Sequence, residues 1–95
     1  MGDISMKFTA KVTVTNKLGL HLRAAAELVK VANKFKCSIT IKSGIQMVNV
    51  KSLMGLMTLA ASKGCKLEII TEGEDSKEAV EAIQKIFINR FNEKE

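Results

Sequence analysis

The chain contains no Trp, no Tyr and no Pro, and only 4 Phe. A core built from it is therefore mainly aliphatic, and few rings are available to stack on nucleobases or sugars. Proline-rich spacers are excluded, and the 6 Gly are scattered, so no flexible linker divides the 95 residues. We expect a single domain over residues 1–95, with residues 1–6 as a flexible leader.

Long apolar runs are also missing. Charged residues interrupt every stretch that could form a membrane-spanning helix of about 20 residues. The beginning of the chain lacks the basic-then-apolar order of a signal peptide. We therefore expect a cytoplasmic protein that does not insert into membranes. In that compartment Cys37 and Cys65 are expected as reduced, buried thiols, and a disulfide between them stays open as the alternative.

Basic residues outnumber acidic ones by 15 to 10, which gives a net charge of +5. This sign favours acidic partners or nucleic acid. The basic residues are, however, spread singly along the chain, without the interleaved aromatic residues of single-strand binders. We therefore expect no nucleic-acid partner. The His, Cys and carboxylate positions show no metal-ligand spacing, so no metal or other cofactor is expected.

Hydrophobic periodicity predicts an alternating series of strands and helices. Strands are predicted over residues 8–15, 38–42, 46–51 and 66–72. Helices are predicted over residues 22–36 and 52–61, and from residue 75 to about residue 91. Each strand is hydrophobic on one face only. The economical fold is therefore an α+β two-layer sandwich, in which a four-stranded antiparallel sheet carries all three helices on one face.

The link between the two middle strands predicts their register. Residues 43–46 suit a two-residue turn with Gly at its first central position. Closing the hairpin there places Ile41 opposite Val48 and Ile39 opposite Val50. Both apolar pairs then share one face, so the turn and the hydrophobic pattern agree.

Four residues are predicted to mark the ends of helices. Ser52 is a good N-cap for the short second helix, and Gly64 is the expected stop of the same helix. Asp75 and Glu78 have the spacing of a capping box at the start of the third helix.

The single histidine, His21, immediately precedes the first predicted helix. A lone histidine is usually structural, and that reading stays open. Here, however, it lies at the expected N-cap, where unpaired N–H groups and the helix dipole favour an anion. Arg23 is suited to gripping a phosphate, and neutral imidazole can accept a phosphoryl group. Because nucleotide-binding motifs are missing, the pattern indicates a phosphoryl carrier, not a catalyst.

Two separated motifs carry a family resemblance. Residues 19–25 read Gly-Leu-His-Leu-Arg-Ala-Ala, and residues 50–56 read Val-Lys-Ser-Leu-Met-Gly-Leu, with Gly64 behind them. Over about residues 8–91 the chain resembles HPr, the family of histidine-containing phosphocarriers of the bacterial phosphoenolpyruvate-dependent sugar phosphotransferase system. The resemblance implies a sheet order of 1-4-2-3.

The resemblance also implies roles for individual residues. Enzyme I, which takes a phosphoryl group from phosphoenolpyruvate, would phosphorylate His21 on Nδ1, and His21 would pass the group to IIA domains of sugar permeases. Arg23 would stabilise the phosphoryl group. Ser52 matches the serine that a kinase/phosphorylase modifies in some bacteria, and this role is compatible with N-capping. Ala24 stands where the family usually has proline, which leaves the loop less rigid.

The predicted helix after Ser52 carries more apolar side chains than one buried stripe needs. In the family this neighbourhood docks partners, and exposed Met suits a surface that fits several of them. Arg23 would place positive charge at the rim of this apolar surface and favour contact with acidic surfaces of partner proteins. The expected docking residues are Leu22, Lys51, Leu53, Met54 and Met57.

Three classes of function stay open at this point. A covalent phosphocarrier, expected as a monomer, requires an exposed and chemically competent His21. A noncatalytic regulator of the same fold would act through phosphorylated Ser52 and would survive the loss of His21. A small basic ligand-binding or nucleic-acid-binding domain would need a basic stripe or a pocket. We favour the phosphocarrier.

Overall fold

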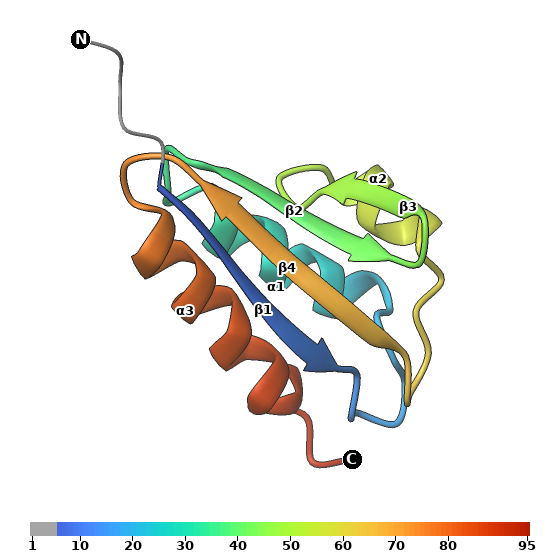
Figure 1. Ribbon diagram of the computed structural model, residues 1–95. Helices are drawn as coiled ribbons and strands as arrows, with labels where there is room; N and C mark the ends of the chain where they lie inside the picture. Colours follow the sequence, from blue (N-terminus) through green and yellow to red (C-terminus); the bar gives the residue numbers. More distant parts are fainter. Residues whose placement is uncertain (1–5) are drawn as a thin grey trace, which may run out of the picture.

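The computed structural model describes residues 6–95, and the description below refers to them. The strands are β1 (Lys7–Thr13), β2 (Ser38–Ser43), β3 (Gln46–Asn49) and β4 (Lys66–Glu72). The helices are α1 (Leu22–Ala32), α2 (Leu53–Thr58) and α3 (Ser76–Ile88), followed by the short turn η1 (Arg90–Asn92). Figure 1 shows α1 and α3 lying across one face of the sheet, with α2 beside β3. The predicted α+β fold is confirmed.

The strands follow the order β1-β4-β2-β3, and all neighbours are antiparallel. Ile41 faces Val48 across the hairpin, as the turn predicts. The Val50 N–H donates to the Ile39 carbonyl at 2.9 Å, so the second predicted pair also forms, although β3 itself ends at Asn49. Likewise, β1 ends two residues before the predicted end at residue 15.

Alternation along the strands buries one face of the sheet. Its inward residues include Val12, Ile39, Ile41, Leu67 and Ile69, and all of them are buried. Leu28 of α1 and Ile83 of α3 are fully buried in the same core. Phe87 packs edge to face on Phe91, with ring centroids 5.1 Å apart. Because burial of each large apolar side chain contributes about 1.5–3 kcal/mol, this layer holds the helices on the sheet.

Helix α1 ends at Ala32, not at residue 36 as predicted. The N–H groups of Lys34 and Phe35 donate to carbonyls three residues back, which tightens the chain into a turn. The Lys51 ammonium then donates to the Phe35 carbonyl at 2.7 Å. The apolar spacing continues through Phe35, but the helix does not.

Helix α2 ends at Thr58, and the prediction that Gly64 stops it is wrong. The left-handed residue that follows this helix is Ala60, with φ of 48°. Gly64 lies further on, where φ is 94° and its N–H donates to the Val14 carbonyl at 2.7 Å. Gly64 therefore shapes the entry into β4.

The predicted capping box at Asp75 and Glu78 does not form among the described residues. Asp75 is the N-cap of α3, but its carboxylate makes no bond to its own helix. It accepts the N–H groups of Lys36 and Cys37 instead, each at 2.9 Å. These bonds, led by the one from Lys36, lower the pKa of Asp75. The carboxylate thus ties the start of α3 to the loop before β2.

Both cysteines are free in the described structure, but only Cys37 is buried, whereas Cys65 is half-buried. Burial raises the pKa of the Cys37 thiol to about 11. Within residues 6–95, none of the helices has the length and apolar character needed to cross a membrane.

The two ends of the described chain lie at opposite ends of the sheet (Figure 1). Met6 belongs to the segment expected as a leader, yet its carbonyl accepts the Gly73 N–H at 2.9 Å and the Ser76 hydroxyl at 3.0 Å. The other residues of the expected leader, 1–5, lie outside the described part. At the far end, the residues after α3 turn back towards the start of α1.

Candidate functional site

His21 lies at the N-cap of α1, as predicted, with φ of −80° and ψ of 177°. The loop before it depends on Gly19, which has φ of 68°. A Cβ at Gly19 would lie 2.6 Å from the Ala61 carbonyl oxygen. The buried Leu20 donates its N–H to the same oxygen at 2.8 Å. The loop is therefore fixed on the segment after α2, and it presents His21 at the start of α1.

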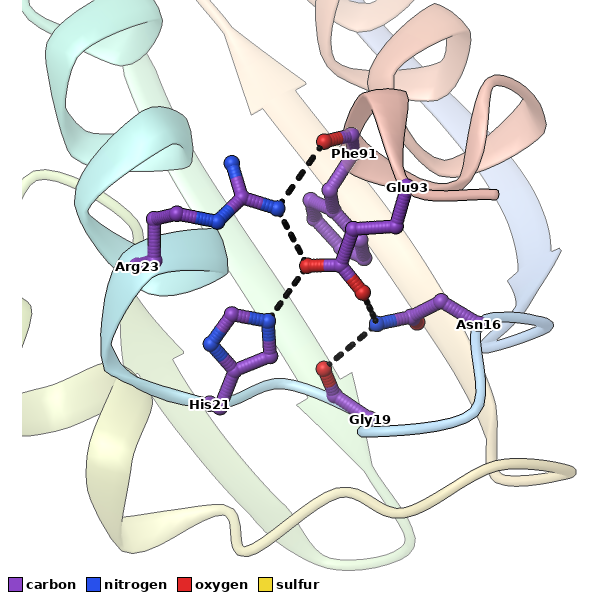
Figure 2. A network of polar contacts seen from close by, with 6 residues as sticks. All are labelled: Asn16, Gly19, His21, Arg23, Phe91 and Glu93. Carbon is purple, nitrogen blue, oxygen red and sulfur yellow. Dashed lines mark hydrogen bonds and ion pairs between the residues drawn. The ribbon is translucent and has the colours of Figure 1, made fainter. Parts of the chain in front are cut away.

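The His21 imidazole contacts a residue from the opposite end of the chain (Figure 2). Its Nε2 hydrogen-bonds to one carboxylate oxygen of Glu93, and the Arg23 Nη2 donates to the same oxygen. The other Glu93 oxygen accepts from the Asn16 amide at 2.8 Å. A single carboxylate is thus held by three side chains.

A left-handed turn brings Glu93 to this position. Residues 90–92 have φ of 52°, 55° and 62°, so α3 does not continue to Phe91 as predicted. Phe91 is buried and packs against Phe87, which anchors the turn. The Phe91 carbonyl accepts from Arg23 at 3.3 Å. Packing of this ring therefore supports a backbone that is costly for residues other than Gly.

Opposing effects act on the Glu93 carboxyl. Burial alone raises its pKa, but the hydrogen bonds from Asn16, His21 and Arg23 outweigh burial, and the net pKa is lowered. The Glu93 side chain is 14% exposed and the His21 side chain 27%, whereas that of Arg23 is 56% exposed. Glu93 is therefore held as an anion, whereas much of the Arg23 side chain remains accessible to solvent.

Asn16 is the buried support of this arrangement. It is fully buried, and its amide also donates to the Gly19 carbonyl at 2.8 Å. Its Oδ1 has no hydrogen-bond partner among residues 6–95. Asn16 thereby connects the loop that carries His21 to the Glu93 carboxylate.

The arrangement can bind and hold an anion. It combines an imidazole, a guanidinium and a helix N-terminus, where unpaired N–H groups favour negative charge. Within residues 6–95, no hydrogen bond is made to the other ring nitrogen, Nδ1, which Figure 2 shows pointing away from Glu93. The side chains line an open hollow of about 350 Å³ at the surface. A phosphoryl group brought by another molecule could reach His21 from solvent.

Ser52 is the N-cap of α2, as predicted, and its hydroxyl accepts the Gly55 N–H at 3.0 Å. Gly55 leaves room for this cap, because a Cβ there would lie 3.2 Å from the Ser52 hydroxyl oxygen. The side chain is partly exposed. Ser52 therefore has a structural role as a helix cap, at a position that is only partly buried.

Comparison with known proteins identifies the family. A family model described as the PTS HPr component phosphorylation site matches residues 8–89. The chain belongs to the HPr family. HPr proteins carry a phosphoryl group within a chain of phosphotransferases and are not self-sufficient catalysts.

Individual HPr proteins are similar over most of their length. The phosphocarrier protein HPr of Xylella fastidiosa (strain Temecula1) is 48% identical over 87% of this chain and 93% of its own. The crystal structure of HPr-C-His from Thermoanaerobacter tengcongensis matches with a TM-score of 0.89 and 35% identity, over 93% of this chain and 99% of that one. The crystal structure of a phosphocarrier protein HPr from Bacillus anthracis matches with a TM-score of 0.81 and 41% identity, over 85% of this chain and 96% of that one.

The expected docking residues differ in how they are exposed. Leu22 and Met54 are largely exposed, with Met54 at 76%, whereas Leu53 is half-buried. Met57 is exposed to a lesser degree. Lys51 directs its ammonium to the Phe35 carbonyl, in the turn after α1. Leu22 and Met54 are at the starts of α1 and α2, which pack against each other, whereas Met57 is near the end of α2.

The sequence reasoning missed two residues of the site, Asn16 and Glu93. Asn16 lies in a segment with the composition of an ordinary loop, and Glu93 is one of several charged residues near the end of the chain. The partner of the buried Asn16 cannot be inferred from sequence spacing, because it lies 77 residues away in the chain. The left-handed turn that delivers Glu93 contains no Gly to signal it.

Proposed function

We propose that His21 is the residue of this HPr protein that carries the phosphoryl group, on Nδ1, from Enzyme I to IIA domains. One observation carries this assignment. His21 and Arg23 lie together at the N-terminus of α1, in a surface hollow where they hold an anion, the Glu93 carboxylate. A phosphoryl group offers the same kind of oxygen acceptors, and Arg23 retains exposed donors for it.

The proposed chemistry needs little beyond this geometry. The Nδ1 lone pair forms a bond to phosphorus while the bond between phosphorus and the donor breaks, and the electron pair of that bond stays with the donor. The helix N-terminus and Arg23 then stabilise the added negative charge. Transfer onward reverses the same step, so the residue acts as a carrier.

Ser52 is proposed as a regulatory site. A kinase that phosphorylates it would add negative charge at the start of α2, where the dipole tolerates it, next to the proposed docking residues. These residues are Leu22, Lys51, Leu53, Met54 and Met57. We further propose that the protein works as a monomer in the cytoplasm, because each transfer step requires brief contact with a different partner.

The proposal is tested by incubating the protein with phosphoenolpyruvate and Enzyme I and measuring the intact mass. One acid-labile phosphoryl group mapped to His21 is expected. His21→Ala should accept none but should stay folded, with its free energy of unfolding lowered by about 1–3 kcal/mol through loss of the hydrogen bond to the ionised Glu93. A folded protein that a competent Enzyme I leaves unmodified would refute the carrier role and favour a regulator that acts through Ser52.

A further inference from the structure

We propose that Glu93 is a positioning residue for phosphoryl transfer at His21. Its carboxylate accepts the Nε2 proton and thereby leaves the lone pair on Nδ1. This inference rests on the function proposed above, and it adds to it a residue near the opposite end of the chain. The contact that motivates it is the hydrogen bond between the His21 Nε2 and a Glu93 oxygen.

The tautomer follows from the inventory of donors. An ionised carboxylate can only accept hydrogen bonds, so the ring nitrogen that faces it must carry a proton. Glu93 is ionised because Asn16, His21 and Arg23 all hold its negative form. A neutral imidazole protonated on Nε2 has its lone pair on Nδ1. Glu93 therefore selects the form of His21 that can attack phosphorus from the exposed side.

Charge during the transfer adds to this effect. When Nδ1 forms its bond to phosphorus, the ring keeps the Nε2 proton and gains positive character, and the donor retains the electron pair of the broken bond. The Glu93 negative charge stabilises that ring. Since the proton stays between Nε2 and Glu93, no further acid or base has to enter the site.

The structure holds Glu93 in place independently of His21. The Asn16 amide fixes the second carboxylate oxygen, and the buried Phe91 anchors the turn before it. Only one terminal nitrogen of Arg23 bonds to Glu93, and the Arg23 side chain as a whole is more than half exposed. Arg23 can therefore hold Glu93 with one side and a phosphoryl oxygen with the other.

The experiment compares Glu93→Ala and Glu93→Gln with the unaltered protein. Glu81→Gln is the matched control, since it removes the same charge from an exposed position of α3 outside the hollow. Two quantities are measured: the population of each neutral imidazole tautomer of His21 by ¹⁵N NMR, and the initial rate of phosphorylation by Enzyme I and phosphoenolpyruvate.

Glu93→Ala should increase the population protonated on Nδ1 and slow phosphorylation about tenfold, the size expected for loss of one hydrogen bond to a charged group. Glu93→Gln keeps an acceptor without charge and should be slowed less. Glu81→Gln should match the unaltered protein in both measurements. A purely structural role of Glu93 would leave the tautomer populations of His21 unchanged, so this measurement separates a positioning role from a structural one.

Two results overturn the inference while the carrier function stands. An unchanged tautomer population and rate in Glu93→Ala would make Glu93 a bystander, and faster phosphorylation would make it a group that blocks His21. If the unaltered protein takes up no phosphoryl group, the proposed function fails and the positioning role fails with it.

Discussion

At the scale of single residues, Gly19 sets the geometry on which the site depends. It combines a left-handed backbone with close packing, because a Cβ would overlap the Ala61 carbonyl oxygen at 2.6 Å. Gly44 in the hairpin has a similar φ of 60°, but a Cβ there would meet nothing within 4 Å. Adding a Cβ at Gly44 therefore carries only the cost of the backbone conformation, whereas adding one at Gly19 carries the cost of steric overlap as well.

Gly19→Ala should therefore destabilise the protein by about 2–4 kcal/mol, whereas Gly44→Ala should cost about 1 kcal/mol from the backbone conformation alone. Urea denaturation measures both. Because Gly19 is next to the residue that precedes His21, its replacement should also slow phosphorylation. Equal destabilisation by the two changes would contradict the close contact at Ala61.

His21 and Arg23 could be recognised from sequence because their chemistry is local. A helix N-terminus favours an anion, and the spacing puts His21 and Arg23 together there, where both contact the Glu93 carboxylate. Glu93 could not be recognised, because its role depends on a turn made by residues that rarely adopt positive φ. Asn16 was hidden for a related reason, since its main partner is distant in the chain.

At the scale of secondary-structure elements, the start of α2 combines a structural and a proposed regulatory role in one hydroxyl. Ser52 accepts the Gly55 N–H and so satisfies a donor that the helix leaves unpaired. An aspartate at the same position can accept that bond and also carries negative charge. The structural and regulatory roles can therefore be separated by two substitutions.

Ser52→Ala should lower the free energy of unfolding by about 1 kcal/mol through loss of the cap, with little effect on phosphorylation of His21. Ser52→Asp should keep the stability and slow phosphorylation by Enzyme I roughly tenfold, because like charges oppose docking on an acidic partner. Thermal melts and initial rates distinguish the two variants. Unchanged kinetics in Ser52→Asp would remove the regulatory role.

The elements themselves were predictable where two local signals agreed. The hairpin register followed from Gly44 together with the pairing of apolar residues, and the structure has that register. Helix ends were less predictable. Helical spacing continues beyond both Ala32 and Ile88, yet the chain leaves the helix there: a tight turn follows Ala32, and residues 90–92 adopt positive φ after Ile88. Hydrophobic periodicity indicates which side chains are buried, but it does not determine the backbone conformation of those residues.

At the scale of the whole molecule, Asp75 joins parts of the fold that are distant in sequence. Its carboxylate connects the start of α3 with the N–H groups of Lys36 and Cys37 before β2. These bonds hold its pKa below the usual value of 3.8. A lowered pKa in the folded state means that the stabilisation is present above about pH 4 and is lost as the pH falls through the lowered value.

Asp75→Asn should therefore destabilise the protein at pH 7 and make its stability less dependent on pH between 5 and about 2. The difference from the unaltered protein should shrink as the pH falls. Urea denaturation at a series of pH values measures this. Glu74→Gln, which removes the same charge from the exposed neighbour, is the control. A difference that stays constant with pH would exclude the carboxylate as its source.

The opposite placement of the two ends of the described chain has a practical consequence for experiments. Met6 is bonded to Gly73 and Ser76 at one end of the sheet, whereas Glu93 contacts His21 at the other. An affinity tag or a surface attachment at residue 95 would therefore be fixed beside the imidazole and crowd any approaching protein. Attachment ahead of Met6 orients the molecule with its reactive end towards the solution, which is the geometry that binding measurements on an immobilised sample require.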